Sequence, residues 1–139
     1  MRMKVKLDPG AVMPLRAHEH DAGLDLYSRE EALVPARGSW EFDTGVHMEI
    51  PEGYVGDVKS KSGLMMKHNI LTDGTVDCGY TGSIMVKLFN HSPQDYWVTK
   101  GEKIAQVVIK KIITPELELV DSLEDTERGA NGFGSSGKF

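Results

Sequence analysis

Short segments in which apolar and polar residues alternate account for most of this chain of 139 residues. In residues 83–90 the apolar Ile84, Val86 and Leu88 occupy every second position, and residues 45–50 show the same period. A period of two places such side chains on one face of a β-strand, so each segment is predicted to turn that face toward a core. The segments predicted as strands are residues 4–7, 22–27, 33–35, 39–42, 45–50, 54–59, 75–76, 83–90, 96–98, 104–110 and 117–120.

Residues 61–68 form the one candidate helix, roughly two turns long. Ser62 at its start is predicted to cap the helix and to leave first-turn N–H groups pointing outward. A helix N-terminus beside a serine hydroxyl suits a phosphate, although a capped connecting helix without a ligand has the same sequence. Because no other segment carries a sustained helical period, the sequence predicts an all-β domain.

Composition narrows the class of protein. The formal net charge of −5 argues against a nucleic-acid polymer as partner, because proteins that bind such polymers usually carry a basic excess. Cys78, the single cysteine, excludes an intrachain disulfide and a cysteine-based zinc site. No apolar run approaches the ~20 residues of a membrane span, and the N-terminus lacks an apolar signal core. We therefore expect one soluble, intracellular protein without a membrane partner, located in the cytoplasm, or in the host cytoplasm if the source is viral.

The composition changes near residue 126. Residues 126–139 are rich in glycine and serine, and Phe133 and Phe139 are their large apolar side chains. We predict a folded domain over residues 1–125 followed by a glycine-rich C-terminal arm over residues 126–139. Consecutive backbone N–H groups in such an arm could wrap phosphate oxygens, and Phe133 could stack on a base.

The stretch from Gly74 to Ile84 carries the clearest candidate chemistry. Two β-branched segments flank a turn rich in glycine and aspartate, which predicts a β-hairpin. An open hairpin can offer backbone N–H and C=O groups to a flat ligand. Asp77 in the turn could orient a water and accept its proton, with Tyr80 nearby. An ordinary surface turn is the alternative, because aspartate favours turns for its own sake.

Several other polar residues each allow two interpretations, one functional and one structural. His18 and His20 suggest a metal site, but their spacing does not fit a helical zinc motif, so we expect surface histidines. Asp25 could be a solvated strand position or a turn cap. Gln106 interrupts an apolar strand and could be a core amide with satisfied hydrogen bonds.

Five stretches in order resemble the motifs of the trimeric dUTPase family, the dUTP diphosphatases. Each is weak alone, but together they extend over nearly the whole chain. They are residues 22–28 (AGLDLYS), 61–64 (KSGL), 74–84 (GTVDCGYTGSI), 101–106 (GEKIAQ) and 128–137 (RGANGFGSSG).

The resemblance implies a distorted jelly-roll or β-barrel with one short helix and a flexible glycine-rich C-terminal arm. It implies hydrolysis of dUTP to dUMP and pyrophosphate, which limits uracil incorporation into DNA and supplies dUMP for thymidylate synthesis. The implied cofactor is Mg²⁺, held by the triphosphate and waters rather than directly by the protein. The implied assembly is a homotrimer with composite active sites, in which the arm of one subunit covers a pocket built by others.

The resemblance also implies roles for individual residues. Asp77 would be the catalytic base, and Asp25 would support the site near the water-ligated metal. The implied substrate-binding residues are Lys61, Ser62, Gly63, Gly74, Thr75, Val76, Tyr80, Met85, Gln106, Arg128, Phe133, Gly134, Ser135 and Ser136. Lys61 departs from the arginine usual in the family: it keeps the charge but loses the bidentate fork of a guanidinium.

Two rival functions remain at this point. A dCTP deaminase of the same fold shares parts of the central hairpin, but its relatives generally lack the glycine-rich end motif present here. A non-catalytic interaction module, such as a phage-type relative that binds another protein, is the second. The presence of Asp77, Ser62, Gln106 and Arg128 argues against lost catalysis.

Overall fold

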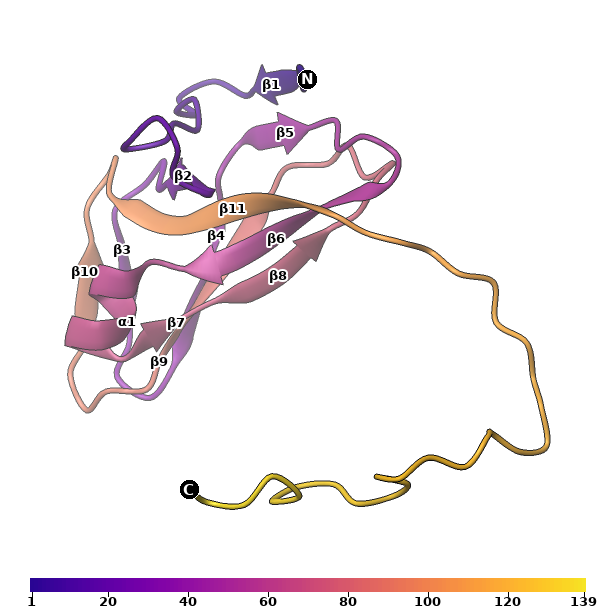
Figure 1. The fold of residues 1–139 in the computed structure, drawn as a ribbon. Helices are drawn as coiled ribbons and strands as arrows, with labels where there is room; N and C mark the ends of the chain where they lie inside the picture. The colour runs from indigo at the N-terminus through magenta and orange to yellow at the C-terminus, as the bar shows by residue number, and fades with distance from the viewer.

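The computed structural model describes residues 1–139 and is built from short strands with a single helix (Figure 1). In chain order the elements are β1 (Val5–Leu7), β2 (Gly23–Tyr27), β3 (Ala32–Val34), β4 (Ser39–Asp43), β5 (Val46–Met48), β6 (Tyr54–Ser60), α1 (Ser62–His68), β7 (Ile70–Leu71), β8 (Asp73–Val76), β9 (Met85–Asn90), β10 (Tyr96–Val98) and β11 (Lys103–Lys111).

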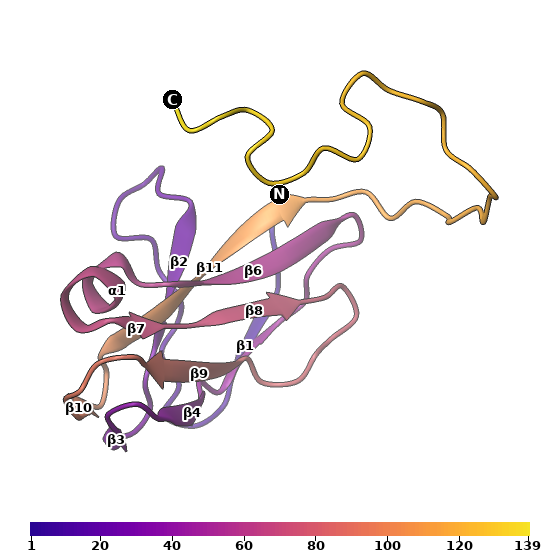
Figure 2. The same cartoon turned by 90° about the horizontal axis from the view of Figure 1, so that it is seen from below.

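The strands form antiparallel sheets that enclose one core. The largest has the order β2-β11-β6-β8, and a three-stranded sheet has the order β4-β9-β7. Two smaller pairs, β1-β5 and β10-β3, close the remaining sides (Figures 1 and 2). Strands adjacent in sequence often belong to different sheets, which is the jelly-roll arrangement. The prediction of an all-β fold of this type is confirmed.

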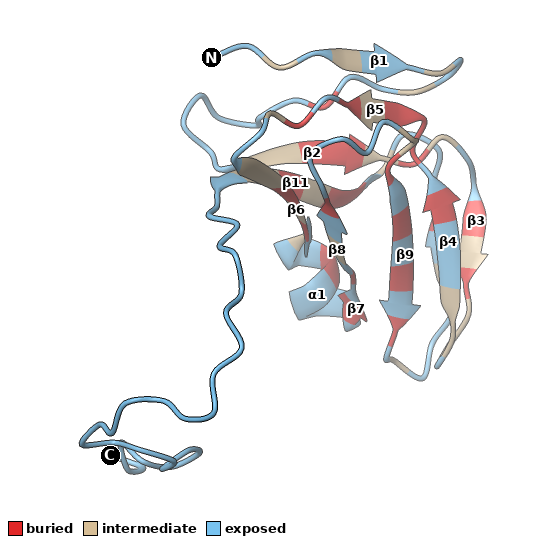
Figure 3. Ribbon diagram, turned by 90° about the vertical axis from the view of Figure 1, so that its right-hand side faces the viewer, coloured by how far each residue is buried: buried red, intermediate tan, exposed pale blue.

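The alternating pattern sets which side chains enter the core. In β9, Val86 and Leu88 are buried while Lys87 and Phe89 are exposed, and Figure 3 shows the colours alternating along this strand. The same alternation in and beside β5 buries its apolar residues. Eighteen buried hydrophobic residues form a single cluster between the sheets. Burial of apolar area is the main force that holds the sheets together.

Two local predictions differ from the structure. The strand predicted at residues 117–120 is wrong: this segment is irregular and exposed, because it has no neighbour within the chain to pair with. Strand β7 was not predicted, since two residues are too few to show a period. It exists because Ile70 and Leu71 pair with Asn90 and Phe89 of β9.

Beyond β11 the chain leaves the folded body. Residues 112–139 are exposed throughout, and they curve away from the sheets without returning to them (Figures 1 and 2). Helix α1 is far too short to cross a membrane, and the chain contains no helix that could.

Candidate active site

A buried carboxylate organises the cleft formed by β2, β11 and β6. Asp25 on β2 is only 3% exposed. Its Oδ1 lies 2.6 Å from the Lys61 Nζ, and its Oδ2 lies 3.2 Å from the Lys103 Nζ. Burying a carboxylate is costly unless it is paired, and here two ammonium groups pair with one carboxylate. The buried charge of Asp25 is thus compensated, and the lining of the cleft as a whole carries two carboxylates, Asp21 and Asp25, and two ammonium groups, Lys59 and Lys61.

Gln106 lies beside this ion cluster because of strand register. On β11 it is directly opposite Asp25 of β2 and Lys59 of β6. Its Nε2 donates a hydrogen bond to the Ser60 carbonyl at 3.1 Å. A Cβ added at Gly23 would lie 2.0 Å from the Gln106 Oε1, so only glycine at that position leaves room for the amide.

The resulting cleft is polar and has a volume of about 380 Å³. It brings together three residues that the sequence analysis assigned to the site from separate motifs: Asp25, Lys61 and Gln106. Its lining residues are Ala17, Asp21, Ala22, Gly23, Asp25, Lys59, Lys61, Gln106 and Val108. The pocket is large enough to admit part of a phosphate chain, but it contains neither Asp77 nor Tyr80.

Helix α1 begins differently from the prediction. Lys61, not Ser62, is the N-cap residue, with extended backbone angles and no side-chain capping bond. The Lys61 side chain is instead engaged with Asp25, and the carbonyl of Lys61 accepts the first helical bond from Met65. Ser62 and Gly63 are exposed at the start of the helix, next to the cleft. The predicted serine cap is therefore wrong, because the charge pair decides the geometry at this end.

The predicted hairpin at residues 74–84 is also corrected. Strands β8 and β9 run side by side, as Figure 2 shows, but no backbone hydrogen bond joins them. Strand β8 pairs with β6, while β9 pairs with β4 and β7. The chain therefore crosses from one sheet to the other through residues 77–84. Gly74 to Val76 and Met85 each pair with another strand on one side, so only their backbone groups that point toward the space between β8 and β9 have no strand partner.

Asp77 opens the crossing loop, directly after β8. It is exposed, and its carboxylate takes part in no ion pair or side-chain hydrogen bond of the chain. Its carbonyl accepts a hydrogen bond from the Tyr80 N–H at 3.2 Å, which closes a tight turn. Gly79 completes that turn with φ of +89°, a conformation that other residues rarely adopt. The carboxylate is thus held at the surface by a defined turn and is free to act on a ligand.

Tyr80 folds back over the same loop. Its hydroxyl donates to the Ser83 carbonyl at 2.8 Å, and the side chain remains about half exposed. A Cβ added at Gly82 would lie 2.5 Å from the Tyr80 hydroxyl, so glycine is required for the ring to lie this close. The loop therefore presents a rigid aromatic side chain next to Asp77.

The cleft and the loop lie at separate places on the four-stranded sheet. Across the sheet, Asp25 pairs with Gln106, Gln106 pairs with Lys59, and Lys59 pairs with Asp73. Asp25 and Asp73 are therefore three strand spacings apart, or about 14 Å. Asp77 lies four residues farther along the chain, or about 13 Å. The two aspartates are thus on the order of 19 Å apart, too far for one small substrate group to touch both.

The predicted site residues of the C-terminal arm lie far from both the Asp25 cleft and the Asp77 loop. Its internal contacts are local: Arg128 donates through Nε to the Asn131 carbonyl at 2.8 Å, and Phe133 is fully exposed. Gly134, Ser135 and Ser136 belong to the same exposed segment. Within a single chain, therefore, the predicted site residues form three groups rather than one.

No three side chains of the His, Cys, Asp and Glu types lie close enough together to share a metal ion. Asp25 does not suit direct metal ligation either, because each of its oxygens already faces an ammonium group. His18 and His20 are exposed, and their nearest partners are the carboxylates of Asp21 and Glu19.

Lys103 pairs with Asp25 although its sequence predicts no such role. It lies within the quoted stretch GEKIAQ, but a lysine after a turn gives no local sign of a buried partner. The signal that could have found it is strand pairing: once β11 is placed beside β2, Lys103 lies opposite Tyr27, two residues from Asp25.

Known proteins resemble this chain over nearly its whole length. A family model described as dUTPase matches residues 10–137. The deoxyuridine 5'-triphosphate nucleotidohydrolase of Yarrowia lipolytica is 45% identical over 141 residues, spanning 99% of this chain and 90% of that protein. The enzyme of the same name from Clostridium acetobutylicum is 44% identical over 135 residues, spanning 95% of this chain and 93% of the relative.

Solved structures of dUTPases also resemble this chain. The dUTPase of Staphylococcus bacteriophage 80alpha with dUPNHPP superimposes with a TM-score of 0.93 and 35% identity over 99% of both chains. A variant dUTPase of phage phi11 of S. aureus, described with a structural Mg(II) ion, gives a TM-score of 0.83. It is 30% identical and covers 90% of this chain and 100% of the phage chain.

Proposed function

Because this chain belongs to the dUTPase family, we propose that it hydrolyses dUTP to dUMP and pyrophosphate in the cytoplasm. The reaction limits the dUTP available for incorporation into DNA and supplies dUMP for thymidylate synthesis. The observation that supports it best is the Asp77 loop: an unpartnered, exposed carboxylate that follows a strand with a free backbone edge.

Recognition of uracil is assigned to the unpaired edges of β8 and β9. On one side, Gly74, Thr75 and Val76 pair with β6 and Met85 pairs with β4. The backbone groups on the other side of each strand line the space between β8 and β9. Uracil offers an N–H between two carbonyl groups, which such edges can complement. Cytosine carries an amino group where uracil has a carbonyl, so buried backbone groups would be left unpaired. That mismatch discriminates strongly against cytosine.

Hydrolysis is assigned to Asp77. A water held by its carboxylate attacks the α-phosphorus, and the carboxylate accepts the proton that the water loses. The new bond joins the water oxygen to the α-phosphorus, and the bond from that phosphorus to the bridging oxygen breaks. Pyrophosphate leaves with the bond electrons, and dUMP remains.

The triphosphate is assigned to the Asp25 cleft and the arm. Lys61, Ser62, Gly63 and Gln106 provide donors at the cleft, and Asp25 holds the lysine ammonium in place. From the arm, Arg128, Phe133, Gly134, Ser135 and Ser136 would close over the nucleotide. Stabilising negative charge in the transition state accounts for most catalysis in such transfers, so dispersed donors are sufficient.

Mg²⁺ is proposed to enter with the substrate, ligated by triphosphate oxygens and water. The chain offers no cluster of ligands for an ion of its own. Bound in this way, the ion would neutralise charge on the leaving pyrophosphate. Asp25 is expected to act beyond the ion's direct ligands, through the lysines that it orients.

A homotrimer with composite sites would reunite the separated groups. The gap between Asp25 and Asp77 within one chain supports this assembly. So does the segment before the arm, in which Ile113, Leu117, Leu119 and Leu123 are each at least 85% exposed. Apolar side chains in such a row are expected to be covered by another subunit.

The function is tested by pyrophosphate release from dUTP, dCTP, dTTP and UTP, each with Mg²⁺. We expect dUTP to be hydrolysed with a kcat/KM at least about 10³-fold above that of the other nucleotides, because each competitor leaves groups unpaired or clashes. Release of ammonia from dCTP would instead identify a deaminase. No turnover of any nucleotide by folded protein would indicate an interaction module.

Tyr80 is predicted to exclude the ribose 2′-hydroxyl. Replacing Tyr80→Ala removes the ring that folds over Gly82 and should raise kcat/KM for UTP relative to dUTP by about tenfold or more. Tyr80→Phe is the matched control: it removes only the hydroxyl bonded to Ser83 and should keep the wild-type ratio. An unchanged ratio in Tyr80→Ala would remove Tyr80 from this role.

A further inference from the structure

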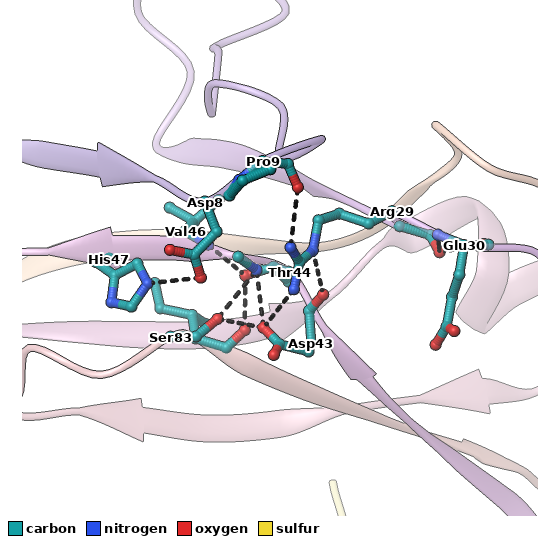
Figure 4. Close-up of polar contacts among 12 residues, drawn as sticks. Asp8, Pro9, Arg29, Glu30, Asp43, Thr44, Val46, His47 and Ser83 are labelled. Atoms are coloured by element: carbon teal, nitrogen blue, oxygen red, sulfur yellow. Dashed lines mark hydrogen bonds and ion pairs between the residues drawn. The ribbon is translucent and has the colours of Figure 1, made fainter.

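The crossing loop is fastened to the turn between β4 and β5 by a polar network (Figure 4). The Ser83 hydroxyl contacts the Asp43 carboxylate and accepts from the Gly45 N–H at 3.0 Å. The Thr44 hydroxyl donates to the Ile84 carbonyl at 2.6 Å. These bonds hold the end of the loop near β9. The middle of the loop, nearer Tyr80 and Asp77, has one side-chain anchor outside the loop itself, His47.

His47 on β5 connects that part of the loop to the end of β1. Its Nδ1 lies 2.8 Å from the Thr81 carbonyl oxygen, and its Nε2 lies 2.9 Å from Asp8 Oδ2. The His47 side chain is 18% exposed and that of Asp8 31%, so both side chains are partly shielded from water. Figure 4 shows the ring of His47 directed at Asp8.

Both partners of the ring are acceptors. A carbonyl oxygen and a carboxylate cannot donate, so each ring nitrogen must carry a proton to form both bonds. A neutral imidazole has one N–H, whereas the imidazolium has two. The observed geometry is therefore that of a positively charged His47. The same contacts raise the pKa of His47 above its usual value of 6.5, the Asp8 hydrogen bond first and the Thr81 carbonyl second.

The other charged groups around the ring are few. Lys6 on β1 is directly opposite His47 in the strand pairing and opposes its protonation. Lys4 and Glu49 line the same shallow hollow, with opposite charges, and the loop contributes the neutral Thr81 carbonyl. Asp8 is itself held by its backbone N–H, which donates to the Gly45 carbonyl at 2.8 Å. The backbone of Asp8 is thus held beside β5, within reach of the ring.

We propose that His47 is a positioning residue whose protonated ring ties the Asp77–Tyr80 loop to the body of the domain. The inference rests on the proposed function of that loop. When the ring loses one proton, it keeps a single donor. A charged acceptor forms the stronger hydrogen bond, so the remaining N–H stays with Asp8 and the Thr81 carbonyl loses its donor. The loop then becomes less ordered, and nucleotide binding weakens as pH rises.

The first test measures the ring itself. In the full-length protein, the nitrogen and carbon chemical shifts of the His47 ring should report an imidazolium at low pH and a titration midpoint above 6.5. The amide of Gly82, which shares a peptide group with the Thr81 carbonyl, should titrate in parallel. A His47 ring that titrates at or below 6.5, or a Gly82 amide that does not follow it, would overturn the proposal. Neither readout depends on enzymatic activity.

The second test measures KM for dUTP against pH. In the wild type, KM should rise about three- to tenfold as pH passes through the pKa of His47, the range expected when one hydrogen bond is lost. In His47→Asn, an amide N–H can take the place of Nδ1 without titrating, so KM should stay low across this range. In His47→Leu, KM should be raised at every pH. Replacing the exposed His20→Asn is the matched control and should keep the wild-type profile.

The two tests separate this inference from the function on which it rests. Active enzyme whose KM profile is identical in wild type and His47→Leu would refute the positioning role and leave the dUTPase function intact. Absence of dUTP hydrolysis in the wild type would refute the function, while the chemical shifts would still report the state of His47.

Discussion

Asp77→Asn is expected to lower kcat for dUTP hydrolysis by about 10²- to 10⁴-fold, the usual contribution of a general base. The carboxamide has nearly the same shape but accepts protons poorly. Because the Asp77 side chain has no partner within the chain, its replacement should disturb neither the turn nor the core. Single-turnover kinetics would measure the loss, and calorimetry with a non-hydrolysable dUTP analogue would show that nucleotide still binds.

Asp73→Asn is the matched control for this experiment. Asp73 is the first residue of β8, the strand that ends just before Asp77. It is also exposed, and it pairs with Lys59 of β6, away from the loop. Its replacement makes the same change of charge and should leave kcat within about twofold of wild type, as expected for a surface position away from the chemistry. If Asp77→Asn hydrolysed dUTP within about threefold of wild type, Asp77 would not be the general base.

Two inactive variants are expected to restore activity when they are refolded together. One is Asp77→Asn with its arm intact, and the other ends at Asp125 and keeps Asp77. If the arm of one subunit closes over the Asp77 of another, random mixed trimers would combine a good arm with a good Asp77 at roughly one site in four. Recovery of about a quarter of wild-type pyrophosphate release is therefore expected, from parents that each show almost none.

The control mixes the truncated protein with a truncated Asp77→Asn variant, so that no arm is present and no activity should return. Native mass spectrometry would establish that mixed trimers form in both mixtures. If mixed trimers form from the original pair without recovery, the arm serves its own subunit and the composite site is wrong.

The sequence by itself determined the faces of the strands and the family of the chain. A period of two in residues 83–90 required Val86 and Leu88 to be buried together, because successive side chains of a strand point to opposite sides. The five motifs identified the family, since their residue types and order are local properties of the chain. Gly23 and Gly82 likewise belong to the motifs, although glycine is needed at these positions because of close contacts with Gln106 and Tyr80.

Only the tertiary structure decided which strands pair and which side chains meet. Residues 74–84 read as a hairpin, yet β8 and β9 belong to different sheets, because the partner of a strand depends on residues remote in sequence. Residues remote in sequence also decided that Lys103 pairs with Asp25 and that Lys61 rather than Ser62 is the N-cap of the helix. They likewise decided that His47 lies between Asp8 and Thr81. Residues 117–120 show the converse: their alternation suits a strand, but a strand forms only where another edge is available to complete its hydrogen bonds.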